Sequence, residues 1–507
     1  METHLLDYFE ETVKKKAASL AIEHNKQEIS FEELKEKAQK LATFLSAKIG
    51  YVTNKPIAVF IPKEINTVVA DIGIMYSSNP FMNLDVKTPK ERLANIFELI
   101  KPIAVITTKK YLNSLPDVSI PTILIDDIDW DTLSPDDEQL HRSALIDTDP
   151  FCIINTSGST GTPKGVVLNH RSFFDFIAVS NERFNFDGSE IMGSLSPVVF
   201  DIYDFELCML MVNGSQLVLL DAMLAAFPAR LLEKMAESHV NFIFWVPSIM
   251  VNIANMGLLD KIKLPDLKLV WFAGEVFPTK QFLVWYDKLP NTTFANLYGP
   301  IEITLDCTYY VIKERPVESE PLPIGIPYHN TDILLLNDEN KRCDFEEAGE
   351  ICVRGTSLAM GYYNNPEKTA LAFTQNPLNS SYPELIYRTG DIAYMRKDGN
   401  IMFKGRKDSL IKHMGYRIEL GEIEHVIEND LKLVKYCCAV YNHDKKEIIL
   451  IYESNHDTTD KEFRTAIAKV FPSYMIPSVF IKLDELPRNT NGKIDRLFLK
   501  KKFGGGI

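Results

Sequence analysis

The sequence lacks the features that place a protein in a membrane or direct it outside the cell. None of its apolar runs approaches the roughly 20 residues of a transmembrane helix. The most apolar stretch, Leu207 to Leu220, is interrupted by Asn213, Gly214 and Gln216. The N-terminus, METHLLDYFEETVKKK, has neither the basic start nor the apolar core of a signal peptide. We therefore expect a cytoplasmic protein without stable membrane insertion.

Patterns that indicate metal clusters, disulfide frameworks or nucleic-acid binding are also absent. The seven cysteines are an odd number without a CxxC pair, so free and buried thiols are expected. The formal net charge of −14 argues against a general nucleic-acid surface. Low-complexity blocks and internal repeats are missing too. What remains is an ordinary globular composition, in a chain of 507 residues that is too long for one domain.

Short apolar runs alternate with amphipathic segments along most of the chain. Residues 1–50 read as helix, β-hairpin and helix, with the turn at Asn25-Lys26. The following alternation predicts a doubly wound parallel sheet. Its expected strands are 57–61, 104–108, 122–125, 151–154, 216–220, 240–246, 269–273 and 293–297. From Ile324 the strands are closely spaced, and after Gly405 helix and strand alternate on a smaller scale.

The predicted fold class is therefore α/β, with two domains. Residues 1–407 are expected to form a large N-terminal domain of doubly wound sheets plus a β-rich subdomain. Residues 408–507 are expected to form a small, mobile α+β domain.

The stretch from Asn155 to Val167, NTSGSTGTPKGVV, predicts a phosphate site after a buried strand. Small hydroxyl residues and glycines leave backbone N–H groups free to surround an anion. It is not a Walker loop, because Lys164 lies between Pro163 and Gly165. Such composition alone leaves a mobile linker open as the alternative. The expected phosphate contacts are Thr156, Ser157, Gly158, Ser159, Thr160, Gly161 and Lys164.

This loop matches the phosphate-binding signature of the adenylate-forming (AMP-binding) superfamily, and further motifs of that family follow in order. They run from ISFEEL at 29–34, through AGEVFP, NLYGPIE, YRTGD and GRKD, to NGKIDR at 491–496. The whole chain resembles the amino-acid-activating branch, meaning nonribosomal peptide synthetase adenylation domains and D-alanine–carrier-protein ligases. The resemblance implies an AMP-forming ligase that uses ATP and Mg²⁺.

The resemblance implies ATP contacts from two strand-end motifs, at Gly274, Glu275, Asn296, Tyr298 and Gly299. Tyr298 offers a flat ring for purine stacking, and Glu302 offers a hard oxygen ligand for Mg²⁺. The family usually has a Thr directly before this Glu, in contact with the α-phosphate, whereas this chain has Ile301. Either Thr304 or a loop hydroxyl substitutes for that Thr, or the contact is missing.

Four further positions match functional residues of the family. Asp391 is expected to accept both ribose hydroxyls, as suits an ionised carboxylate, and Arg406 to reach ribose or phosphate. Asp408 lies at the family's hinge, and Gly415 at a loop that leaves room for a phosphopantetheine arm. The resemblance assigns the catalytic lysine to Lys493, between the substrate carboxylate and the α-phosphate. The expected catalytic residues are Lys493, Glu302 and Thr156.

Asp201 lies where amino-acid-activating members keep the carboxylate that pairs with the substrate α-ammonium. Fatty-acid and aryl relatives have no cation to neutralise there, so Asp201 favours an amino acid. The other expected pocket residues are Ile202, Phe205, Phe244, Trp271, Ala273, Leu297, Leu305 and Asp306, with Lys493. Bulky walls favour glycine or alanine of either hand, while Asp306 keeps serine open. Core packing is the alternative for each aromatic residue.

Carrier and condensation motifs of the types GG(D/H)SL and HHxxxD are absent, so the expected partner is a separate phosphopantetheinylated carrier protein. The D-alanine ligases of teichoic-acid modification and the glycine ligases for lipid A are built in a similar way. Two other functions stay open. One is an acyl- or aryl-CoA ligase, and the other is an inactive nucleotide-binding relative, which Ile301 makes conceivable.

Overall fold

The N-terminal segment folds as the sequence predicts. The structure is a computed structural model that describes residues 4–135, 145–156, 163–407, 410–453, 459–488 and 494–505. Its first elements are α1 (Leu5–Lys16), β1 (Leu20–His24), β2 (Gln27–Ser30) and α2 (Phe31–Ile49). Asn25 and Lys26, with φ of 47° and 68°, form the hairpin turn. A capping box between Ser30 and Glu33 starts α2.

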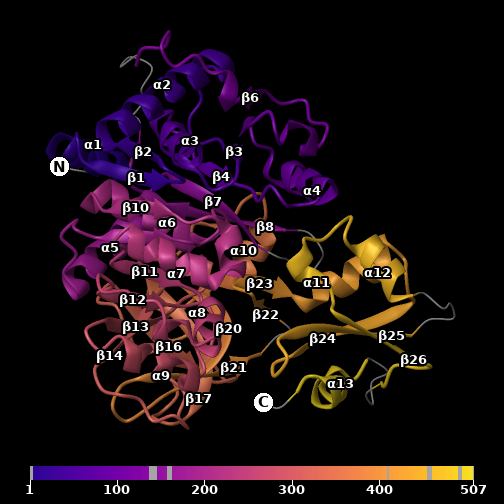
Figure 1. Cartoon of the computed structure of the whole chain (residues 1–507). Coiled ribbons are helices and arrows are strands. Elements are labelled where there is room, and N and C mark those ends of the chain that lie inside the picture. Colours follow the sequence, from indigo (N-terminus) through magenta and orange to yellow (C-terminus); the bar gives the residue numbers. More distant parts are fainter. Residues whose placement is uncertain are drawn as a thin grey trace.

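Two mixed sheets build the large unit (Figure 1). In spatial order the nine-stranded sheet contains β15 (Ile326–Pro327), β14 (Thr308–Ile312), β13 (Thr293–Tyr298), β12 (Leu269–Phe272), β11 (Phe242–Trp245), β9 (Ile191–Ser194), β10 (Gln216–Leu219), β1 and β2. The seven-stranded sheet contains β18 (Gly361–Tyr362), β8 (Lys164–Asn169), β7 (Pro150–Thr156), β4 (Phe81–Asn83), β3 (Ile57–Phe60), β5 (Ala104–Thr107) and β6 (Thr122–Leu124). The inner pairs are parallel, so the predicted α/β class is confirmed.

Helices connect these strands and bury the apolar faces of the sheets. They are α3 (Ile65–Tyr76), α4 (Lys90–Ile100), α5 (His170–Phe184), α6 (Asp201–Cys208), α7 (Pro228–Glu237), α8 (Pro247–Asn255), α9 (Thr279–Lys288) and α10 (Pro366–Ala372). One large hydrophobic cluster joins residues from α1, α2, α3, α6 and strands of both sheets. The large unit therefore shares a common core.

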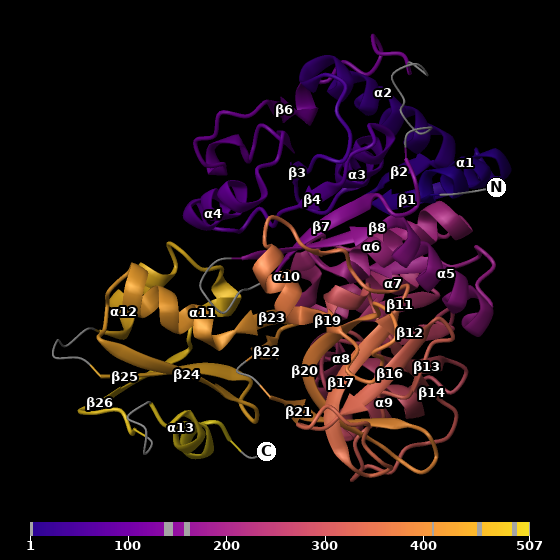
Figure 2. The ribbon, with the colours of Figure 1, turned by 180° about the vertical axis from the view of Figure 1, so that it is seen from behind.

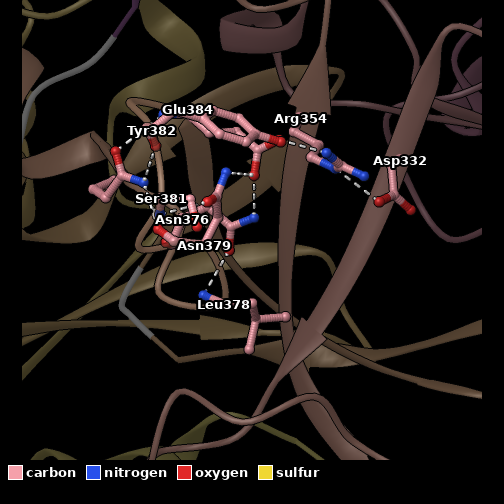
Figure 3. A network of polar contacts seen from close by, with 9 residues as sticks. Asp332, Arg354, Asn376, Leu378, Asn379, Ser381, Tyr382 and Glu384 are labelled. Carbon is pink, nitrogen blue, oxygen red and sulfur yellow. Dashed lines mark hydrogen bonds and ion pairs between the residues drawn. The ribbon is translucent and has the colours of Figure 1, made fainter.

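The closely spaced strands after Ile324 form a third sheet, as predicted. It contains β16 (Thr331–Leu336), β17 (Ala348–Gly355), β20 (Leu385–Met395), β19 (Phe373–Gln375) and β21 (Ile401–Arg406). Arg354 on β17 bridges Asp332 on β16 and Glu384, at 2.8 and 2.5 Å (Figure 3). Asn376 and Asn379 also donate to Glu384, which ties the loop before β20 to the sheet.

The small unit follows β21 and lies beside the large one in both views (Figures 1 and 2). It contains the hairpin of β22 (Leu410–His413) and β23 (Tyr416–Glu419), a sheet of β24 (Tyr436–Asn442), β25 (Glu447–Glu453) and β26 (Val479–Leu483), and the helices α11 (Leu420–His425), α12 (Asp460–Ile467) and α13 (Arg496–Phe503). Among the described residues, no hydrophobic cluster contains side chains from both units. The boundary between residues 407 and 408 stays a prediction, and Asp408, the predicted hinge, lies outside the described residues.

The cysteines are all free, as expected, and six of them are buried. Cys343 is half-buried. In the part of the chain that the structure describes, no helix combines the length and the apolar composition that a membrane span requires.

Candidate active site

A cavity of about 160 Å³ lies where the two units meet. The large unit lines it with residues at the carboxyl ends of β4, β7, β11, β12 and β13 and at the start of α6. Carboxyl ends of parallel strands are where open α/β sheets bind ligands. The small unit closes the cavity with the β22–β23 hairpin and with Tyr474 and Met475.

Many of the predicted site residues come together around this cavity. Those that line it are Thr156, Asp201, Ile202, Phe244, Ala273, Gly274, Gly299, Leu305, Asp306, Asp391, Arg406 and Gly415. Ser157, Gly158, Ser159, Thr160, Gly161, Asp408 and Lys493 lie outside the described residues.

Phe205, Trp271 and Leu297 do not line the cavity. Phe205 and Trp271 are fully buried, and their rings stack with centroids 5.2 Å apart. Both rings also contact Phe244, at 5.6 and 5.5 Å, which does face the cavity. They therefore form the packed layer behind the pocket wall, which is the core-packing role left open by the sequence.

Three ionisable side chains, those of Asp201, Asp306 and Lys412, share the end of the cavity near α6. Burial raises the pKa of Asp201 to about 6, and the nearby Lys412 ammonium opposes this shift. Burial, together with the charge of Asp201, raises the pKa of Asp306 well above its ordinary value. Burial thus disfavours the ionised form of both carboxyl groups, and the Lys412 ammonium opposes this effect at each of them.

The predicted ribose ligand Asp391 is held by two neighbours. It accepts hydrogen bonds from the Tyr298 hydroxyl and the Arg406 guanidinium, both at 2.5 Å. Tyr298 is 8% exposed and does not line the cavity, so here it positions Asp391. At the turn after Tyr298 only glycine fits, because a Cβ on Gly299 would lie 2.1 Å from the carbonyl oxygen of Leu305.

Glu302, the predicted metal ligand, is completely buried beside the cavity. One of its oxygens accepts from the Tyr362 hydroxyl at 2.9 Å, and the other from Arg417 at 2.5 Å. Burial alone would raise the pKa of Glu302, but the charges of Arg417 and Lys164 and the hydrogen bonds to the carboxylate together outweigh it and hold that pKa below its ordinary value. Glu302 is therefore a stable buried anion. Within the described ranges, no cluster of three or more metal-binding side chains occurs.

Ile301 lines the cavity at the position where the family usually has Thr. Thr304, one of the two predicted substitutes, is fully buried and does not line the cavity. Its hydroxyl has no hydrogen-bond partner among the described residues, so it points into the protein interior. A loop hydroxyl, of which Thr156 lines the cavity, and a missing contact both stay open as alternatives.

The β22–β23 hairpin of the small unit contacts the large unit directly. The Gly415 N–H donates to Glu275 at 2.9 Å, and Glu275 also accepts from the Ser248 N–H at the start of α8. Gly415 has φ of 82°, and a Cβ there would lie 3.1 Å from Val246. The predicted phosphate-loop cation Lys164 pairs with Glu419 at 3.3 Å.

Sequence reasoning did not single out four residues that line this cavity, namely Arg92, Lys412, Arg417 and Tyr474. Lys412 and Arg417 flank Gly415 closely in the sequence, so the two cations around that loop were an available signal. Arg92 and Tyr474 carry no such signal.

Residues 9–363 match the family described as AMP-binding enzyme. Zwittermicin A synthase ZmaJ from Bacillus cereus is 30% identical over 512 aligned residues, covering 98% of this chain and 95% of that protein. Tyrocidine synthase 1 from Brevibacillus parabrevis is 29% identical, covering 96% of this chain and 44% of that protein.

Solved structures at lower identity share the fold. The Vibrio cholerae adenylation domain AlmE, in complex with glycyl-adenosine-5'-phosphate, has a TM-score of 0.82 at 18% identity, covering 99% of this chain and 98% of its own. PA1221, a protein containing adenylation and PCP domains, has a TM-score of 0.82 at 20% identity, covering 99% of this chain and 84% of its own. The o-succinylbenzoate CoA synthetase of Bacillus subtilis has a TM-score of 0.82 at 19% identity, covering 100% of both chains. The chain therefore belongs to the AMP-binding enzyme family.

Proposed function

We propose that the protein activates a small amino acid as its aminoacyl-adenylate and passes it to the phosphopantetheine thiol of a separate carrier protein. The observation that carries this proposal is Asp201. Its carboxylate lines the cavity together with Phe244, Ala273 and Lys412, and burial raises its pKa to about 6. The Lys412 ammonium opposes that shift only in part, so the carboxylate would still gain from a cation in the ligand. The α-ammonium of an amino acid supplies it, whereas fatty and aryl acids do not.

The bulk of the neighbouring side chains supports a small substrate. Ile202, Phe244 and Leu305 line the same cavity with large apolar side chains. Glycine and either enantiomer of alanine are the favoured substrates. The AlmE neighbour holds glycyl-adenosine-5'-phosphate, which agrees with this size class.

Asp306 favours serine as a second candidate. Its carboxyl lines the cavity, is 4% exposed, and has a pKa well above the ordinary value because of burial. A carboxyl group accepts a hydrogen bond from a hydroxyl when it is ionised, and can also donate one to it when it is protonated. A serine side chain would give Asp306 a partner that glycine and alanine cannot offer.

In the first half-reaction, a carboxylate oxygen of the amino acid attacks the α-phosphorus of ATP. The bond to the bridging oxygen breaks, and pyrophosphate leaves with the electron pair. Asp201 holds the ammonium end, so that the carboxylate faces the nucleotide, while Asp391 and Arg406 hold the ribose. Lys164 and, by resemblance, Thr156 and Lys493 offset the negative charge that builds up on phosphate.

Glu302 is the residue that would hold Mg²⁺, together with phosphate oxygens and water. A single buried carboxylate fits this ion, which keeps several waters and is usually bound by one or two carboxylates. The ion would supply positive charge against the phosphate oxygens.

In the second half-reaction, the thiol sulfur attacks the carbonyl carbon, the bond from that carbon to the phosphate oxygen breaks, and AMP leaves. The thiol proton passes to solvent. The backbone at Gly415 reaches the cavity without a side chain, which leaves space for a thin pantetheine arm.

Amino-acid-dependent ATP–pyrophosphate exchange tests the proposal. We expect exchange with glycine, L-alanine, D-alanine or serine. A long-chain fatty acid and an aryl acid serve as comparison substrates, because the CoA synthetase neighbour shows that this fold also suits such ligases. Exchange with the acids alone would establish the CoA-ligase alternative. ATP binding without any exchange would establish an inactive relative.

A further inference from the structure

We propose that Lys63 is a positioning residue, which holds Asp201 in place by fixing the segment that leads from β9 into α6. The inference rests on the proposed function, since it concerns how the site presents the partner of the substrate ammonium group. Lys63 itself does not line the cavity, so it acts through this segment and not on the substrate.

The Lys63 ammonium is held against oxygen atoms at the end of β9. It donates to the carbonyl oxygens of Ser194 at 2.5 Å and Ser196 at 3.0 Å, and its nitrogen lies 3.4 Å from the Ser194 hydroxyl. Ser194 is completely buried and Ser196 is 8% exposed. An ammonium group has three N–H donors, so it can bind all three oxygens at once. Lys63 therefore fixes the first residues of the segment.

Ser194 connects this cluster to α6. Its hydroxyl donates to a carboxylate oxygen of Glu206 at 2.5 Å, and Glu206 is 1% exposed. Glu206 and Asp201 lie on the same short helix, α6. The two ends of the segment, Ser194 and the helix that begins at Asp201, are thus joined through one buried hydroxyl next to the Lys63 ammonium.

Lys63 brings this support from a different sheet. It follows β3, a strand of the seven-stranded sheet, whereas Ser194 ends β9 in the nine-stranded sheet. Val199 and Phe200, the residues directly before Asp201, line the cavity with it. A segment released from Lys63 would therefore change the position of Asp201 and of the wall beside it. The predicted ribose ligands Asp391 and Arg406 come from other strands and would keep their places.

The strength of this support depends on the charge of Lys63. Burial lowers the pKa of Lys63 to about 8, and the charges of Glu206 and Asp221 oppose that shift. Asp221 lies after β10, with one carboxylate oxygen 3.1 Å from the His24 ring. A neutral amine has only two N–H donors and no charge, so it binds the three oxygens less well. The segment should therefore loosen as pH rises through about 8.

The test measures the KM values for amino acid and ATP in the exchange reaction of the full chain, with the amino acid that gives the fastest exchange. For Lys63→Met at pH 7.5, we expect the KM for the amino acid to rise about tenfold and the KM for ATP to change less than about twofold. Calorimetric titration with AMP should show retained binding and hence a folded variant.

Lys63→Arg provides the readout that a merely structural role would not change. Its guanidinium stays charged at every pH used, whereas the Lys63 ammonium does not. Between about pH 7 and pH 9.5, the KM for the amino acid should rise more steeply in the wild-type protein than in Lys63→Arg. The α-ammonium of the substrate titrates equally in both experiments, so the difference between the two profiles belongs to Lys63.

Lys16→Met is the matched control. Lys16 also donates to two carbonyl oxygens of the large unit, those of Gly188 at 2.5 Å and Gly214 at 2.8 Å, and it does not line the cavity. This variant should leave the KM for the amino acid unchanged.

Ser194→Ala keeps the charge of Lys63 and removes only the hydroxyl link to Glu206, so it serves as a second variant if Lys63→Met does not fold. It should raise the KM for the amino acid about threefold and leave the KM for ATP unchanged. The inference is overturned if the variants that fold leave both KM values unchanged or raise both equally, or if Lys63→Arg has the wild-type pH profile. Exchange by the wild-type protein tests the proposed function separately, before any variant is measured.

Discussion

At the scale of single residues, the proposed role of Asp201 as partner of the substrate ammonium group predicts a pH dependence. Its pKa of about 6, raised by burial, means that the carboxylate ionises as pH rises through that value. We expect the KM for the amino acid in the exchange reaction to fall between pH 5 and pH 7. Asp201→Asn should abolish this dependence and raise KM at pH 7.5 by at least about a hundredfold, as loss of a buried charge pair implies.

Calorimetric titration with AMP provides the control for Asp201→Asn, since nucleotide affinity should be retained. Unchanged exchange kinetics in this variant would remove Asp201 from the ammonium site.

Asp71 on α3 predicts a pH effect on stability that is independent of catalysis. It is fully buried, accepts from Tyr203 at 2.7 Å and Asn83 at 3.1 Å, and burial raises its pKa to about 7. The folded state then holds a proton that the unfolded state releases above about pH 4, so this group costs stability as pH rises to 7 and beyond.

Asp71→Asn should therefore raise the midpoint of thermal unfolding at pH 8 and raise it less at pH 5, where the acid of the folded state is protonated and resembles the amide but the acid of the unfolded state has begun to ionise. The difference corresponds to several kcal/mol at most. A variant that is equally destabilised at both pH values would show that Asp71 is needed as a charge.

Several site residues could be found from sequence because their motifs follow strand ends. Thr156, Gly274, Gly299 and Asp391 all reach the cavity. The orientation of Tyr298 could not be predicted, since it depends on the hydrogen bond to Asp391, far away in the sequence. The sequence likewise does not show whether an aromatic residue lines the pocket or packs behind the pocket wall, because that depends on tertiary packing.

At the scale of elements, the hairpin depends on Gly415. Its φ of 82° disfavours any L side chain, and an added Cβ would meet Val246 at 3.1 Å. Gly415→Ala should slow transfer to a pantetheine thiol about tenfold more than it slows ATP–pyrophosphate exchange, as about 1 to 2 kcal/mol of strain in the docked hairpin implies.

Gly399→Ala is the control for Gly415→Ala, because it makes the same substitution at a glycine outside the hairpin. Gly399 has φ of 85° in the turn before β21, with no atom within 4 Å of an added Cβ. Gly399→Ala introduces the same backbone strain without a new side-chain contact, so the rates of exchange and of thiol transfer should both stay near the wild-type values. Equal slowing of the two half-reactions in Gly415→Ala would contradict a role confined to the docked hairpin.

Regular elements with clear periodicity were predictable, and α2 and β3 begin where expected. The most apolar stretch was harder to interpret. Residues 207–220 contain the end of α6, a π-helical turn at Met209–Asn213 and the strand β10. A continuous apolar run does not distinguish a buried helix from a buried strand, because both faces of each are covered.

At the scale of the whole molecule, two cores are joined by polar contacts. Arg92 on α4 pairs with Glu422 on α11 at 2.5 Å, and Glu422 is 0% exposed. Glu422→Gln should weaken docking and lower the unfolding temperature of the small unit by several degrees, as loss of a buried ion-pair partner implies. The unfolding temperature of the large unit should not change, and this transition can be recognised because AMP binding raises its temperature.

Differential scanning calorimetry of the full chain is the measurement, and Glu447→Gln is the control. A single transition that shifts as a whole would contradict the separation of the two cores.

The existence of two units was predictable from the change in strand spacing after residue 405. Their docking was not, because the pairs between Arg417 and Glu302 and between Lys164 and Glu419 join residues 115 and 255 positions apart. In the sequence, Arg417 and Glu419 look like ordinary surface charges, while Glu302 and Lys164 were assigned to the metal and the phosphates of ATP.

The burial of the native thiols has a practical consequence for measuring the motion between the units. Six of the seven cysteines are inside the protein, and Cys343 is half-buried. Maleimide dyes attached to one new surface cysteine in each unit would therefore meet a nearly silent background once Cys343 is replaced by serine. Fluorescence energy transfer between single pairs of dyes could then follow the opening and closing of the molecule in real time.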